Sequence, residues 1–109
     1  MAEMGTARIR VGSATQGQPV QVRALILHPM ETGLRKDPKT GEKIPAHFVE
    51  KVLADYNGER VFEADWSASI SKNPYASFYL NPGSGGTLTM TWLDNKDNTF
   101  TAEAEVEVG

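Results

Sequence analysis

The sequence predicts an all-β protein, an immunoglobulin-like antiparallel β-sandwich of about seven strands. Short segments alternate between apolar and polar side chains, turn residues separate these segments, and none shows a convincing helical period. A length of 109 residues is enough for a two-layer core without disulfides. We therefore expect one domain over residues 1–109, in which residues 1–5 are flexible.

A strand over residues 20–27 organises this prediction. Its branched side chains lie between two prolines, which cannot donate hydrogen bonds to a sheet. One face is apolar throughout, whereas the other begins polar and ends with Leu25 and Leu27. A strand of this kind is usually central and covered on both faces, so we expect either the long loop over residues 30–45 or another protein to cover these leucines.

The remaining strands follow from the same alternation. They cover residues 6–11, 48–56, 60–66, 75–80, 87–92 and 99–108, of which the last two have the cleanest pattern. Three glutamates share the outer face of the last strand: Glu103, Glu105 and Glu107. Charges on an exposed edge commonly prevent sheet-to-sheet aggregation, so we assign them no binding role.

Asn57-Gly58 predicts a tight hairpin, because both residues tolerate the positive φ of a type I′ turn. A two-residue turn would place Leu53 opposite Phe62, but the core face of the first strand is carried by its neighbours Val52 and Ala54. Either a bulge shifts one strand, or the hairpin is apolar on both faces and one of them meets a partner.

The segment over residues 31–43 holds seven charged residues and a proline-glycine turn at residues 37–41. We interpret it as a solvated β-excursion. A connection this long within a small domain is more often functional than idle.

Composition excludes several classes of function. The formal charge of −3 and the isoelectric point near 5.3 give no reason to bind nucleic acid or an anionic membrane, because both attract a clustered basic field. The sequence has no cysteine, which excludes disulfides, thiolate metal sites and cysteine nucleophiles within it. The first residues show neither the basic start nor the apolar segment of an export signal, so we expect the chain to have no signal of its own.

Chemistry-bearing motifs are equally sparse. The two histidines, His28 and His47, lie at opposite ends of the long loop and could meet where it closes. Together with Met30 they would suit copper, but a blue-copper site needs a cysteine, so we expect no metal and no cofactor. We expect histidines at strand ends that hydrogen-bond to the backbone, and no enzymatic activity.

Apolar residues in positions that should face solvent are the clearest functional signal. They are Leu25, Leu27, Met30, Leu34, Leu53, Phe62, Tyr75 and Tyr79. A domain of this size rarely leaves a large contiguous apolar patch bare, so these residues indicate a protein interface.

One hexapeptide, His28-Pro29-Met30-Glu31-Thr32-Gly33, occurs with further short motifs in a characteristic order. These are Arg35, Ile44-Pro45, Tyr56-Asn57-Gly58-Glu59, Val61-Phe62, Ala64-Asp65, Asn73-Pro74-Tyr75 and Phe78. In this order they resemble the SoxZ family, a subunit of the bacterial sulfur-oxidation carrier, over nearly the whole chain.

The resemblance implies an immunoglobulin-like, non-catalytic subunit that forms a heterodimer with a SoxY-type subunit. In that family SoxY holds the sulfur substrate on a cysteine in a mobile glycine-rich tail and presents it to other sulfur-oxidation enzymes, which dock transiently. The family is exported to the periplasm folded, with the signal-bearing SoxY. Many relatives have a cysteine at the position of Ala54, and some have arginine at that of Ala46, so no role of those side chains is transferred here.

We therefore predict a companion subunit that helps to shelter or dock the thiosulfate-loaded arm of its partner. The residues predicted to contact the partner or its arm are Met30, Glu31, Thr32, Gly33, Arg35, Asn73, Pro74 and Tyr75. Arg35 is the candidate anion contact, whereas Gly33 is equally well explained as a turn glycine.

Two alternatives remain open at this point. The same apolar residues could close a homodimer of a self-associating adhesion or scaffold module that has no role in sulfur chemistry. A mononuclear metal redox enzyme on an immunoglobulin-like sandwich is a third possibility, but the sequence lacks the ligand set for it.

Overall fold

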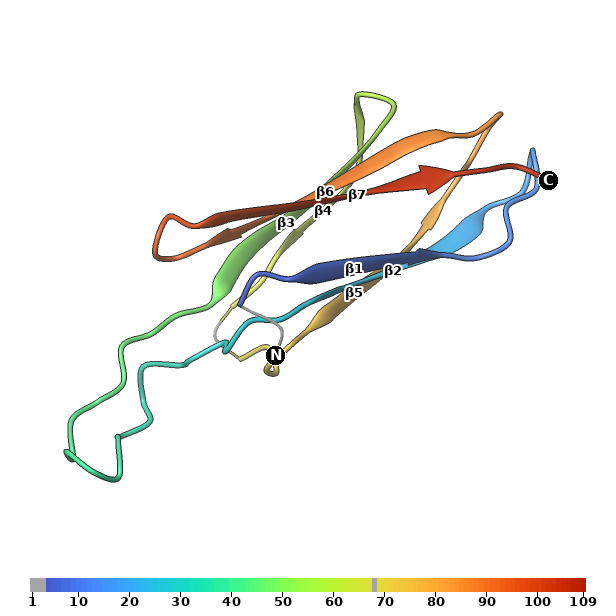
Figure 1. Ribbon diagram of the computed structural model, residues 1–109. Helices are drawn as coiled ribbons and strands as arrows, with labels where there is room; N and C mark the ends of the chain where they lie inside the picture. The colour runs from blue at the N-terminus through green and yellow to red at the C-terminus, as the bar shows by residue number, and fades with distance from the viewer. Residues whose placement is uncertain (1–3, 68) are drawn as a thin grey trace.

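The structure, a computed structural model, describes residues 4–67 and 69–109 (Figure 1). Within these residues the chain forms strands and no helix. The described chain therefore contains no helix that could cross a membrane. The strands are β1 (Ala7–Val11), β2 (Val20–Ile26), β3 (Val49–Tyr56), β4 (Glu59–Asp65), β5 (Tyr75–Leu80), β6 (Gly86–Asp94) and β7 (Thr99–Val106). The predicted all-β class is confirmed, with strand ends that differ by only a few residues from those expected.

The strands form two antiparallel sheets that face each other as the layers of a sandwich (Figure 1). The smaller sheet has the order β1-β2-β5 and the larger has the order β4-β3-β6-β7. The strand predicted to be central, β2, pairs with β1 on one side and β5 on the other. The start of the described chain is already anchored, because Gly5 donates a hydrogen bond to the carbonyl of Leu27 at 2.7 Å.

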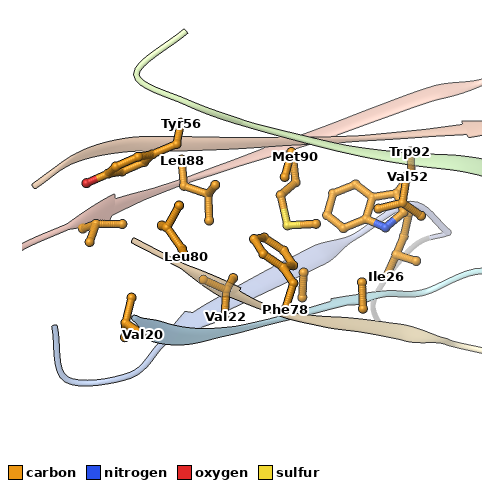
Figure 2. Close-up of a cluster of buried hydrophobic side chains, with 14 of the residues drawn as sticks. Val20, Val22, Ile26, Val52, Tyr56, Phe78, Leu80, Leu88, Met90 and Trp92 are labelled. Atoms are coloured by element: carbon orange, nitrogen blue, oxygen red, sulfur yellow. The ribbon is translucent and has the colours of Figure 1, made fainter. Parts of the chain in front are cut away.

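The core lies between the sheets and consists of alternate residues from the facing strands, as Figure 2 shows. Its fully buried members include Val22, Ile26, Val52, Leu88, Met90 and Trp92. The strict alternation of β6 places its three large apolar side chains in this layer and leaves its threonines half-buried on the outer face. The period-2 pattern therefore builds the core directly from the sequence.

A bulge in β4 resolves the phase conflict of the predicted hairpin. Ala54 pairs with Phe62 instead of Val61, and the register shifts between Ala54 and Asp55. The extra residue, Val61, is 40% exposed, whereas the ring of Phe62 stacks on Phe78 of the other sheet with centroids 4.5 Å apart. The expected pairing of Leu53 with Phe62 is wrong, and the bulge alternative is confirmed.

The β2–β3 excursion (residues 27–48) projects beyond the end of the sandwich (Figure 1). Its outgoing and returning segments are joined by isolated bridges between Glu31 and His47 and between Lys36 and Lys43. This confirms a solvated β-excursion. It does not fold back over Leu25 and Leu27, so of the two covers considered for these leucines the loop is excluded, and another protein stays a prediction.

The predicted surplus of apolar surface is only partly present. Met30 is 5% exposed, so its predicted exposure is wrong, and Phe62 is half-buried against the core. The other six apolar residues of this set differ in how far their side chains are exposed. Leu25, Leu27 and Leu53 are half-buried, while Leu34, Tyr75 and Tyr79 are exposed.

The bulge register makes a prediction about stability. Substitution Phe62→Ala should lower the free energy of unfolding by about 2–3 kcal/mol, because it removes a ring packed between the sheets. Its neighbour provides the control, since Val61→Ala should change this free energy by less than about 0.5 kcal/mol. Urea unfolding measures both values. A larger cost at Val61 than at Phe62 would contradict the bulge.

Candidate functional site

The structure brings together the two segments predicted to contact a partner. The amide of Asn73 donates to the carbonyl of His28 at 2.9 Å, and the amide of His28 donates to Oδ1 of Asn73 at 3.0 Å. Asn73 has a φ of 50°, a left-handed conformation that asparagine tolerates better than most residues. The start of the excursion is thereby fixed to the β4–β5 connection.

A groove of about 560 Å³ lies between these segments. It is lined by Pro29, Met30, Glu31, Thr32 and Arg35 on the excursion and by Ser69, Ile70, Ser71 and Lys72 on the connection. A shallower hollow of about 410 Å³ continues along the connection as far as Tyr75. The predicted site residues other than Gly33 therefore border one continuous depression.

Two of the predicted site residues contribute to the core more than to the surface. Met30 has a φ of 50°, and its sulfur accepts a hydrogen bond from the amide of Val49 at 3.3 Å. Pro74 is buried, and its carbonyl accepts a hydrogen bond from the amide of Ile26 at 3.1 Å. Met30 thereby anchors a wall of the groove, and Pro74 anchors a wall of the adjoining hollow.

Arg35 is already engaged within the chain. Its guanidinium donates two hydrogen bonds to the carboxylate of Glu31, in the bidentate arrangement that suits these two groups. The hydrogen bond from Arg35 lowers the pKa of Glu31, and the same contact raises the pKa of Arg35. An incoming anion would have to compete with Glu31, which weakens the expected role of Arg35.

Lys72 is a cation that the sequence analysis did not single out. It lies on the opposite wall of the groove from Arg35 and also lowers the pKa of Glu31 through its charge. Among the described residues it forms no ion pair with an acidic side chain. Of these two cations it is therefore the better placed candidate for an anion contact.

Turn geometry accounts for the remaining predicted residues of the excursion. The hydroxyl oxygen of Thr32 accepts a hydrogen bond from the amide of Leu34 at 3.0 Å. Gly33 has a φ of 85°, and a Cβ atom there would lie 3.1 Å from the Cβ of Ala46. The backbone of the excursion thus requires glycine at this position whether or not a partner binds.

A buried cluster behind the groove closes the base of the excursion, and we call it the Asp94 clasp (His28, His47, Asp94 and Asn98). Oδ2 of Asp94 accepts from Nε2 of His28 at 3.2 Å, from Nε2 of His47 at 2.7 Å and from Nδ2 of Asn98 at 3.0 Å. Oδ1 accepts from the amides of Lys96 and Asn98, each at 2.9 Å. The expectation that the two histidines meet is confirmed. The expected backbone hydrogen bond is found at His28, whose Nδ1 accepts from the amide of Met30, but both rings also bond to the side chain of Asp94.

The clasp has the spacing of a metal site but the hydrogen bonds of a structural network. One ligand atom from each of His28, His47 and Asp94 lies within 4.8 Å of the others. The amide of Met30 donates to Nδ1 of His28 at 3.1 Å, so the proton of this neutral ring belongs on Nε2 and is donated to Asp94. A metal ion at Nε2 would have to displace that proton.

Burial and hydrogen bonding act on the two titratable groups in different ways. Burial lowers the pKa of His28 and outweighs the opposing hydrogen bond to Asp94. Burial alone would raise the pKa of Asp94, but the donors from Asn98, His47 and His28 together lower it well below its usual value. The clasp therefore holds a neutral His28 against an ionised Asp94.

Comparison with known proteins decides the family. A model of the SoxZ family, described as "Sulphur oxidation protein SoxZ", matches residues 9–105. This chain belongs to the SoxZ family. No curated protein matches it.

Solved structures with this fold belong to several kinds of protein. One is a superoxide reductase (neelaredoxin) from Ignicoccus hospitalis, with a TM-score of 0.69, 18% identity, and coverage of 95% of this chain and 80% of that one. Another is the sulfur carrier protein SoxY from Chlorobium limicola f thiosulfatophilum, with a TM-score of 0.62, 15% identity, and coverage of 94% and 78%. The hypothetical protein PH1083 from Pyrococcus horikoshii OT3 has a TM-score of 0.63, 16% identity, and coverage of 97% and 90%. At these low sequence identities, the similarity of this chain to each of the three structures shows only that they share a fold.

The clasp predicts that removing the charge of Asp94 lowers the stability of the fold more than removing the charge of a neighbouring acid. Asp94→Asn should lower the free energy of unfolding by about 2–4 kcal/mol, because an amide cannot accept all five hydrogen bonds and would turn its own donors toward others. The control is Asp97→Asn, which changes an exposed acid in the same turn. Equal urea midpoints for the two variants would show that the clasp does not support the fold.

Acid should weaken the fold through His28. Its folded pKa lies below its ordinary value of 6.5, so the unfolded chain takes up a proton first as the pH falls. Between pH 6.5 and 5 the free energy of unfolding should therefore fall with decreasing pH, by at most about 1.4 kcal/mol per pH unit. The lowered pKa of Asp94 acts in the same direction, but only near and below pH 3.8.

Urea unfolding at several pH values measures this slope, and His28→Gln should make it shallower. A free energy that stays level from pH 7 to 5 would contradict the buried neutral histidine.

Proposed function

We propose that the chain is the non-catalytic companion subunit of a sulfur carrier complex. In this proposal it pairs with a SoxY-type subunit that bears the covalently bound, thiosulfate-derived intermediate during bacterial sulfur oxidation. The family match over residues 9–105 is the observation that carries the proposal.

The absence of cysteine supports this division of labour. Covalent attachment of sulfur and exchange with disulfides both require a thiolate, and this sequence has none. The chain cannot carry the sulfur intermediate on a thiol of its own, nor be trapped in a mixed disulfide beside a reactive cysteine. Both properties suit a companion of a subunit that supplies the thiol.

The groove beside the excursion is the proposed contact for the partner or its arm. Its exposed borders include Thr32, Arg35 and Lys72, and the two cations face it from opposite walls. An oxidised sulfur group on the arm is anionic and attracts such cations. Glu31, which is bound to Arg35, limits how strongly an anion is held, and this suits an arm that must leave for other enzymes of the pathway.

We further propose that the pair works in the periplasm, to which the chain is exported folded together with a signal-bearing partner. Other sulfur-oxidation enzymes would dock transiently on the pair. Fractionation of cells that express both chains tests the location, and a pair found only in the cytoplasm would exclude it.

Pairing is the direct test of the proposed function. A purified SoxY-type subunit and this chain, mixed at micromolar concentration, should elute together from a size-exclusion column, ahead of either subunit alone. Sedimentation of the isolated chain provides the control for self-association. Two separate peaks from the mixture would contradict the proposal, and a stable homodimer that ignores SoxY would favour the scaffold alternative.

A further inference from the structure

The outer face of the smaller sheet has an unusual composition, and we call it the arginine face (Arg8, Arg10, Arg23, Leu25, Tyr75 and Tyr79). The three arginines are exposed and come from β1 and β2, and the two tyrosines are 63% and 70% exposed on β5. Leu25 is half-buried beside Tyr75, its partner on β5. A hollow of about 340 Å³ is lined by the three arginines, Leu25 and Tyr75.

Two of these arginines lie directly opposite each other. The register of β1 against β2 pairs Arg10 with Arg23, and Arg8 with Leu25. Like charges at opposed positions of a sheet destabilise it. The isolated subunit therefore tolerates an electrostatic cost at this position that an outside negative charge would remove.

No acidic side chain relieves this cost among the described residues. None of the three arginines takes part in an ion pair there, although Arg35 and Arg60 both do. The exposed acids of the strands lie instead on the larger sheet, and they include Glu63, Asp65, Glu103 and Glu105. A chain with a formal charge of −3 thus keeps one purely cationic face.

The aromatic residues make this face suitable for a protein partner. Tyrosine and arginine are the residue types enriched at the centres of protein interfaces, where charged pairs and rings are desolvated together. An extended charged nucleic acid would also bind cations, but the negative net charge of the whole chain opposes it. The combination of charge and exposed rings favours an acidic protein surface.

A second copy of this chain does not fit the arginine face. A two-fold dimer would place the three arginines against themselves, and this juxtaposition repels. Pairing with the acidic side of another copy would be head-to-tail and would build a ring or an open filament, not a pair. The occupant that satisfies the charge within a single pair is a different protein.

We propose that the arginine face is the docking surface for an acidic, partly apolar patch of the carrier subunit. This inference rests on the proposed function and specifies the surface that the function leaves open. Tyr75 belongs to this face and also borders the hollow of the β4–β5 connection. A partner seated on the face would therefore adjoin the groove that receives the arm.

The substitution Arg10→Glu tests the proposal, because it should leave the isolated chain at least as stable as wild type and yet weaken its binding to the partner. In the isolated chain it replaces a repulsive pair by an attractive one with Arg23, so the urea midpoint should stay level or rise. Its dissociation constant for the SoxY-type subunit, measured by calorimetry, should increase about tenfold. Raising the salt concentration should weaken wild-type pairing and reduce the difference between the two proteins.

Lys96→Glu is the matched control, because it makes the same change in net charge at an exposed position in the β6–β7 turn. Its affinity should stay within about twofold of wild type. If wild type pairs and Arg10→Glu pairs equally well, the proposed face is wrong while the proposed function stands. If wild type does not pair at all, the proposed function fails and this inference fails with it. A homodimer of the isolated chain that Tyr79→Ser abolishes would also overturn the inference.

Discussion

One carboxylate connects the sandwich to its most distinctive appendage. Asp94 lies at the end of β6 and accepts hydrogen bonds from His28 and His47, which stand at the two roots of the β2–β3 excursion. These bonds add to backbone contacts such as those between Glu31 and His47, and to the hydrogen bond that Asn73 accepts from the amide of His28. The wall of the groove that carries Glu31 and Arg35 depends on where these roots are fixed.

The sequence was sufficient for features that depend on neighbouring residues. Alternation along 87–92 predicts the buried side chains of β6, and Asn57-Gly58 predicts the turn that joins β3 to β4. Contacts between distant segments could not be predicted in this way. The bulge at Val61 is favoured by stacking of Phe62 on Phe78, and Asp94 lies 66 residues from His28.

The same limit applies to the candidate site. The hexapeptide beginning at His28 and the Asn73-Pro74-Tyr75 motif indicated two segments that the structure brings together, but not that Met30 would face inward or that Glu31 would engage Arg35. The arginine face escaped notice because it requires the register of β1 on β2. Its three arginines are separated in the sequence, and the negative net charge of the whole chain gives no sign of a local cationic surface.

The inward position of Met30 has a consequence for the oxidation of its sulfur. Its thioether is 5% exposed and accepts the amide of Val49, so oxidants reach it only when the base of the excursion opens. A sulfoxide at this sulfur would bring a strong dipole and an additional oxygen into a sealed space. Oxidative damage would thus be confined to molecules whose excursion had already come loose.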